Sequence, residues 1–196
     1  DVDFLLAIGS DSLKAALEGA ERQPIFFSLA GDSFVDGLNP DGFKHEAIRG
    51  GAPVEWASSA LIDLAAMIAL PPSRIALLVT QNDLDSVTAA ELVGERVRDS
   101  EVDIIRVEAA GAEGVTAAVR FAVDTGASAI LLAPSFVLND GLGDMFAVAR
   151  DANIPVLGVT RGQVERGAAL ALGPVPEDNG RAVGKLIGNS LGVGAR

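Results

Sequence analysis

Short hydrophobic runs alternate along the chain with stretches in which apolar residues recur at helical spacing. Five of the runs end in a loop of small and polar residues: DFLLAI before GSDS, IFFSLA before GDS, IALLVT before QNDLDS, AILLA before PSF, and PVLGV before TRG. Continuous hydrophobic runs of this length are typical of strands buried on both faces of a parallel sheet. Because open α/β sheets bind ligands at the carboxyl ends of their strands, we expect these loops to face a small molecule.

Helical patterns separate the strands almost throughout. Strands are also expected at 103–107 and 167–173, and helices at 12–21, 53–69, 86–99, 113–124, 141–151 and 176–191. Asp11 or Ser12 is the expected cap of the first helix, and Asp85 or Ser86 that of the helix at 86–99. This alternation predicts an α/β fold of parallel sheets with helices on both faces.

One long stretch, residues 31–52, is rich in Gly, Asp and Asn and shows no clear period. We expect it to be a linker or crossover. The sequence therefore predicts two lobes, with a partial first lobe and crossover in residues 1–50 and a fuller second lobe in residues 51–196.

Composition narrows the classes of partner. Of the 196 residues, 49% are hydrophobic and 21% charged, which allows a sizeable core. The formal net charge of −12, with no basic stripe, disfavours nucleic acid and anionic membrane surfaces. The chain has no cysteine, which removes thiol nucleophiles and disulfides, and no apolar run approaches the ~18 residues of a membrane span.

The first two loops supply the candidate ligand contacts of the first lobe. They are Ser10, Asp11, Ser12, Ala30, Gly31 and Asp32. Hydroxyls and free helix N–H groups at the first loop suit a carboxylate, whereas the charge of Asp11 disfavours a free phosphate. Asp32 suits a ligand ammonium group. An ordinary helix cap and a turn aspartate explain the same residues, and these alternatives stay open.

The other three loops supply the candidates of the second lobe. They are Asn82, Ser86, Ser135, Phe136, Thr160 and Arg161. Phe136 either stacks on a ligand or packs in the core. Arg161 either binds a carboxylate or pairs with Asp140 or Glu165. The pair Asp83 and Asp85 suggests a hard cation, but the glycine and distant glutamate of a calcium loop are absent, so a helix cap is the preferred interpretation.

No catalytic motif is found. The chain lacks a GxSxG motif, a P-loop and a GxGxxG after a strand, and His45, its only histidine, lies in the irregular stretch. No nucleophile and base can be paired from the sequence, so we expect no enzymatic activity, no cofactor and no metal. Trp56, on the expected helix 53–69, is assigned to the core in preference to stacking on a ligand.

The polar loops and their strands, taken in order, resemble the type I solute-binding proteins of ABC importers, in the group that includes tryptophan- and phenylalanine-type binders. The segments that carry this resemblance are IGSDSLKAALEGAERQPIFFSLAGDSFVDGL, PPSRIALLV, AILLAPSFVLND and NIPVLGVTRGQVERGAALALG. It extends over nearly the whole chain. One departure is Asp32-Ser33, where the family has Asp-Pro.

The resemblance implies a protein of two Rossmann-like lobes. It also implies a location in the periplasm or elsewhere outside the cytoplasm. The lobes would close on an amino acid or similar carboxylate and deliver it to a membrane permease. By position, Ser10, Ser12, Ala30 and Asp32 would hold its carboxylate and ammonium. From the second lobe would come Asn82, Ser86, Ser135, Phe136 and Thr160.

Family members begin with a further strand, helix and strand and continue past Gly192, so the resemblance implies a fragment or shortened member with an incomplete first lobe. No signal peptide is visible. The strand at 3–8 would then have an unpaired, apolar edge, from which we expect dimerisation or poor solubility. Two other functions stay open: a ligand-sensing domain of a regulator, and a flavodoxin-like or racemase-like enzyme with Asp32 or Asp83 as base.

Overall fold

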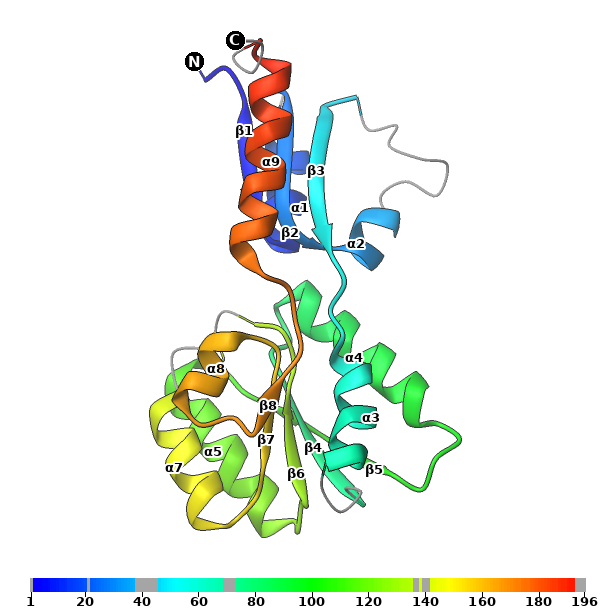
Figure 1. The fold of residues 1–196 in the computed structure, drawn as a ribbon, viewed down its shortest axis with the longest axis vertical. Coiled ribbons are helices and arrows are strands. Elements are labelled where there is room, and N and C mark those ends of the chain that lie inside the picture. The colour runs from blue at the N-terminus through cyan, green and yellow to red at the C-terminus, as the bar shows by residue number, and fades with distance from the viewer. Residues whose placement is uncertain are drawn as a thin grey trace. The chain divides into compact units, whose positions relative to one another are not determined.

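Two separate parallel sheets organise the chain, one of three strands and one of five (Figure 1). The structure, a computed structural model, describes residues 2–20, 22–37, 46–68, 73–135, 138 and 142–192. Unit 1 comprises Asp1–Glu55 and Pro174–Arg196, and unit 2 comprises Trp56–Gly173. The predicted α/β class with parallel sheets is confirmed. Within the described residues, no helix is both long and apolar enough to cross a membrane.

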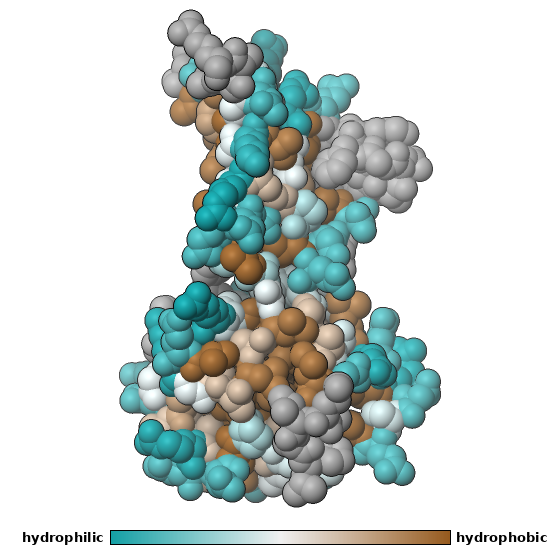
Figure 2. All heavy atoms as spheres, in the orientation of Figure 1, coloured by the Kyte–Doolittle hydropathy of each residue, from teal (hydrophilic) through white to brown (hydrophobic). Residues whose placement is uncertain are grey.

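Unit 1 is built on the three-stranded sheet, with its strands in the order β1-β2-β3 and all parallel. Its elements are β1 (Leu5–Ile8), α1 (Ser10–Gly19), β2 (Ile25–Gly31), α2 (Asp32–Gly37), β3 (Ile48–Val54) and α9 (Pro176–Ser190). Phe27 and Leu13 belong to a core between the sheet and α1, whereas Phe26 and Val183 pack on the other face under α9. The solvent side of α9 is polar (Figure 2).

Unit 2 is built on the five-stranded parallel sheet, in the order β5-β4-β6-β7-β8. Its elements are α3 (Ser58–Ile68), β4 (Arg74–Val79), α4 (Leu84–Val97), β5 (Asp103–Glu108), α5 (Gly111–Asp124), β6 (Ala129–Leu132), α7 (Leu142–Asp151), β7 (Val156–Gly158), α8 (Arg161–Arg166) and β8 (Leu170–Ala171). Figure 1 shows the order in which these elements follow one another.

Both faces of this second sheet are buried, as its continuous hydrophobic runs predict. Successive residues of a strand point to opposite faces. Leu77 and Leu131 therefore pack with residues of α3 and α4, whereas Leu78 and Leu132 pack with residues of α5 and α7. Each of these four leucines is at most 1% exposed.

The prediction of an irregular stretch at 31–52 is wrong in its described parts. Residues 32–37 form α2, and β3 begins at Ile48. The consecutive glycines Gly50 and Gly51 hide β3 from a hydrophobicity pattern, yet Gly51 is required by packing. A Cβ there would lie 2.3 Å from the ring of Phe27. The helix expected from residue 53 begins at Ser58 instead.

The structure also divides the chain differently from the prediction. Residues 174–196 were placed in the second lobe but belong to unit 1. The reason is α9, which packs on β2 and β3 with Val183 and Ile187 against Phe26 and Ala52. The order of elements along the sequence does not predict that α9 packs back onto unit 1, because this packing joins distant parts of the chain.

The strand at the start of the chain departs from the expected burial. Leu6 and Ile8 of β1 are 44% and 49% exposed, although the DFLLAI run predicted burial on both faces. β1 pairs with β2 alone among the described strands, and α9 packs on β2 and β3. One face of β1 is thus apolar and uncovered within the described part of the chain.

Candidate functional site

The order of strands in unit 2 reverses between β4 and β6. From β4 the chain goes to β5 on one side and then crosses to β6 on the other. The crossover loops leave the sheet in opposite directions at such a switch point, and ligands of open α/β sheets bind outside the carboxyl ends of the two strands. The loops that begin at Thr80 and at Ala133 are therefore the candidate site of this unit.

Hydroxyl groups connect these two loops. The hydroxyl of Ser135 donates to Thr80 Oγ1 over 3.1 Å, and the backbone N–H of Thr80 donates to Ser86 Oγ over 2.9 Å. The structure thus brings together the predicted Ser86 and Ser135, with Thr80 between them. The sequence analysis missed Thr80, although it is the polar residue that ends the run IALLVT.

The loop after β4 also carries an amide without a partner. Asn82 is exposed, and its side chain makes no hydrogen bond to any described residue. Asp83, rather than the predicted Asp85 or Ser86, is the N-cap of α4, and its carboxylate accepts from the N–H of Ser86 at 3.0 Å. The helix-cap interpretation of the Asp83 and Asp85 pair therefore accounts for Asp83. Within the described residues, no group of three or more His, Cys, Asp or Glu side chains is arranged to hold a metal ion.

The loop after β7 is organised by a capping box. Thr160 is the N-cap of α8, and Gln163, which is 2% exposed, returns its side chain to the loop. Gln163 Oε1 accepts from the N–H of Val159 at 2.7 Å and of Thr160 at 3.1 Å. Arg161 pairs with Glu165 at 2.9 Å, one of the alternatives considered from the sequence, and its side chain is 92% exposed.

In unit 1, a serine joins the ends of β1 and β2. Ser10 is buried, and its Oγ accepts from the N–H of Gly31 at 2.9 Å. Gly9, with φ 87, is the N-cap of α1 and gives no side-chain cap, so the expected cap at Asp11 or Ser12 is wrong. The N-cap residue of α1 therefore contributes no side-chain hydrogen bond to the first turn of the helix.

The remaining unit 1 candidates differ in what they can offer a ligand. Asp11 and Ser12 are exposed on the first turn of α1, and Asp32 is partly buried at the start of α2. Ala30 lies in the core beside Leu13, so only its backbone is available. Two residues discussed from the sequence, Phe136 and His45, lie outside the described residues, as does Asp140.

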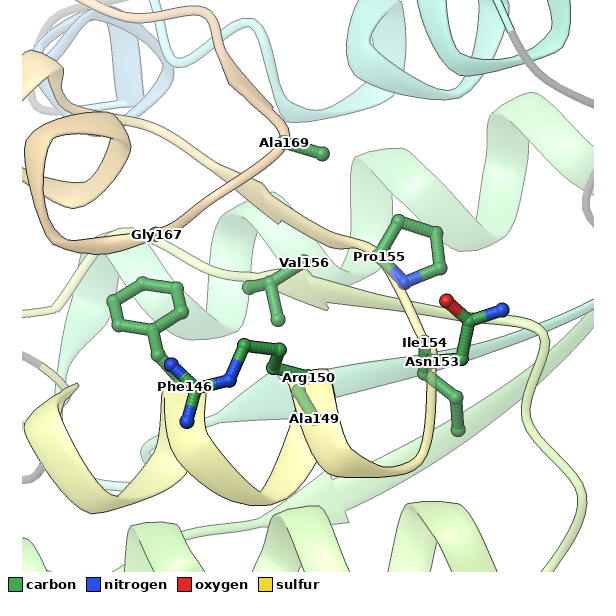
Figure 3. Close-up of a pocket in the computed structure, with 9 residues that line it drawn as sticks. All are labelled: Phe146, Ala149, Arg150, Asn153, Ile154, Pro155, Val156, Gly167 and Ala169. Carbon is green, nitrogen blue, oxygen red and sulfur yellow. The ribbon is translucent and has the colours of Figure 1, made fainter.

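A shallow cavity of about 260 Å³ lies elsewhere in unit 2. It is lined by Phe146 and Arg150 of α7, by Pro155 and Val156 at the start of β7, and by Gly167, among others (Figure 3). Pro155 precedes β7, so the cavity is at the amino end of this strand, opposite to the edge that carries the candidate loops. No candidate residue from the sequence lines it.

Comparison with known proteins gives matches among solved structures. A conserved domain protein from Vibrio cholerae matches with a TM-score of 0.88 at 18% identity, over 98% of this chain and 64% of that one. An ABC domain in complex with L-Trp from Streptococcus pneumoniae matches with a TM-score of 0.85 at 16% identity, over 98% of this chain and 65% of that one. This chain therefore spans less than two thirds of either.

A regulator shares the same architecture. A LacI family transcriptional regulator from Bifidobacterium animalis matches with a TM-score of 0.66 at 13% identity, over 97% of this chain and 71% of that one. No protein-family model matches the sequence, and no curated protein does. None of the three structures is described as an enzyme.

Identities this low establish a fold and leave the activity to be argued from the site. The resemblance found in the sequence is confirmed at that level. The chain has the α/β fold of the type I periplasmic solute-binding proteins, and it also matches a substrate binding protein from Clostridium difficile with a TM-score of 0.64. LacI-type regulators share this fold.

Proposed function

We propose that this protein is the extracytoplasmic solute-binding component of an ABC importer and that it binds an amino acid or a similar small carboxylate. The observation that carries the proposal is the switch point of unit 2, where Thr80, Ser86 and Ser135 form one hydrogen-bonded group and Asn82 offers an unpaired amide. Amide and hydroxyl groups of this kind fix the orientation of small ligands.

Unit 1 carries candidate ligand contacts of its own. Its candidates are the first turn of α1, with Ser12 exposed and without a hydrogen-bond partner among the described residues, and Asp32 at the start of α2. The first turn of α1 suits a carboxylate because a helix N-terminus carries partial positive charge. Thr160 of unit 2, and Phe136, remain proposed contacts on the strength of the sequence resemblance. Arg161 remains a proposed contact for its positive charge, although its guanidinium pairs with Glu165.

The proposal is tested by a thermal-shift screen with the L-amino acids and small monocarboxylates. A ligand at 100 times its Kd stabilises the folded state by about 2.7 kcal/mol, which is a readily measured shift of the unfolding midpoint. Asn82→Ala should reduce the shift, whereas Asn189→Ala, which removes an exposed amide on α9, should leave it unchanged. No stabilisation by any compound would refute the proposal.

The second candidate is the ligand-sensing domain of a transcriptional regulator, favoured by the match to the LacI family regulator. Both functions need a small-molecule site, so binding alone does not separate them. Cell fractionation does: recovery of the native protein outside the cytoplasm supports the importer, and recovery in the cytoplasm with bound DNA supports the regulator.

A further inference from the structure

Two polar atoms in unit 2 are buried without a hydrogen-bond partner. They are Nε1 of Trp56 and Oγ of Ser58, and neither has a partner among the residues that the structure describes. Ser58 is 1% exposed. Because buried polar groups in folded proteins are nearly always hydrogen-bonded, a pair of unpaired ones only two residues apart calls for an occupant.

Both atoms lie at the start of α3, whose own donors are also unpaired. The N–H groups of Ala60 and Leu61 donate to the carbonyl of Ala57, so the helix begins directly after Ala57, whose methyl side chain cannot accept a hydrogen bond. The backbone N–H groups of Ser58 and Ser59 are left without an acceptor in the described residues. An indole N–H can only donate, and a hydroxyl can donate, so the four groups together require an oxygen acceptor.

The local charge favours an acceptor that is negative. Among the described helices of ten or more residues, α3 alone has no acidic residue in its first turn; α1, α4, α5, α7 and α9 each have at least one. Since a helix N-terminus carries partial positive charge, a carboxylate at α3 meets no opposing side-chain charge within that turn.

The surroundings of this position are apolar. Trp56 packs against the core cluster that contains Leu61 and Val79, and so do Leu170 and Leu172, all three of them partly exposed. Figure 2 shows hydrophobic residues gathered on the face of unit 2 where β8 and the start of α3 lie. An apolar wall beside a cluster of donors is the arrangement expected for a carboxylate that carries a hydrophobic group.

We propose that the start of α3 is a carboxylate-binding subsite, in which the indole N–H of Trp56, the hydroxyl of Ser58 and the free N–H groups of the first turn hold the carboxylate of an apolar ligand. This subsite deepens the proposed function and rests on it. The indole is partly exposed while its nitrogen is buried, so rotation of the Trp56 side chain gives the ligand access.

Trp56 also provides the assay, because it is the chain's single tryptophan and the chain has no tyrosine. The experiment titrates L-leucine, L-valine and 4-methylpentanoate, each with its amide as a matched compound, into the full chain and follows tryptophan emission together with calorimetry. We expect an acid to change the emission and its amide to bind about tenfold more weakly, the effect of losing one hydrogen bond to a charged group.

Single substitutions test the groups of this subsite separately from the other proposed ligand contacts. Trp56→Phe removes the indole N–H and keeps a six-membered ring, and Ser58→Ala removes the hydroxyl; each should weaken binding of the acid about tenfold. Ser58→Ala should do so without lowering the unfolding midpoint of the free protein, because its hydroxyl makes no hydrogen bond to a described residue there. Ser59→Ala, which keeps the backbone N–H, is the control and should bind as wild type.

The outcomes are distinct. Binding by calorimetry with unchanged Trp56 emission and equal affinity of W56F and S58A overturns the subsite and leaves the proposed function standing. A lowered midpoint of Ser58→Ala with unchanged affinity in both variants shows that the groups hold a structural water and also overturns it. Absence of binding by every compound in this set and in the wider thermal-shift screen overturns both proposals.

Discussion

Two buried serines, Ser10 after β1 and Ser86 after β4, are each predicted to hold their loop through one buried backbone hydrogen bond. Ser86→Ala removes the acceptor of the Thr80 N–H, 2.9 Å away, in a place where Ser86 is 0% and Thr80 8% exposed. A buried donor left unsatisfied costs about 1–3 kcal/mol. The better helix propensity of alanine offsets this cost by only a few tenths of a kcal/mol.

Amide hydrogen exchange measures this loss at the affected atom. A loss of about 1–3 kcal/mol should lower the protection of the Thr80 amide by roughly 5- to 150-fold. Ser10→Ala makes the matching change in unit 1, where the Gly31 N–H loses its acceptor at 2.9 Å. Each variant should deprotect its own amide and leave the amide of the other unit as it was.

The control is Ser12→Ala, because Ser12 is exposed and makes no hydrogen bond to a described residue. It should alter stability by less than about 0.5 kcal/mol. Wild-type protection of Thr80 in S86A would refute the assignment of this serine as the holder of the loop. Equal loss at both amides in either variant would refute the local nature of the effect.

Two further predictions concern packing and the exposed edge. Gly173→Ala should destabilise the fold by about 3 kcal/mol in urea unfolding, because a Cβ there would lie 1.8 Å from the carbonyl oxygen of Val159. Gly180→Ala is the control and should be neutral or stabilising, because open space surrounds Gly180. Wild-type stability of G173A would contradict the close approach of Gly173 to Val159. If the uncovered face of β1 drives self-association, L6K and I8K should lower the apparent mass in light scattering at high concentration. A wild-type chain that is monomeric under the same conditions would contradict the expected dimer.

Much of the fold could be predicted from hydrophobic runs, and the exceptions have identifiable causes. Strands β2, β4, β6 and β7 are buried on both faces, so each could be predicted from its continuous hydrophobic run. Gly50 and Gly51 give β3 no hydrophobic signal, because Phe27 of the neighbouring strand occupies the space above Gly51. The return of α9 to unit 1 depends on contacts between distant parts of the chain, which no local pattern encodes.

The candidate site could also be predicted only in part from the sequence. Polar residues at strand ends pointed to Ser86 and Ser135, which the sheet order then brings together. Thr80 was missed because it ends a hydrophobic run. For Trp56 the core was preferred to ligand stacking, because no sequence pattern reports that its indole nitrogen lacks a partner. Arg161 was a candidate for its charge, yet its pairing with Glu165 depends on the four-residue spacing along α8.

The most direct test of the account is calorimetric titration of the full chain with each compound that raises its unfolding midpoint, in wild type and in Asn82→Ala. The account predicts saturable binding of one molecule per chain, weakened in N82A and unchanged in N189A. Equal affinity of wild type and N82A, or no compound that binds, would contradict a ligand site at the switch point of unit 2.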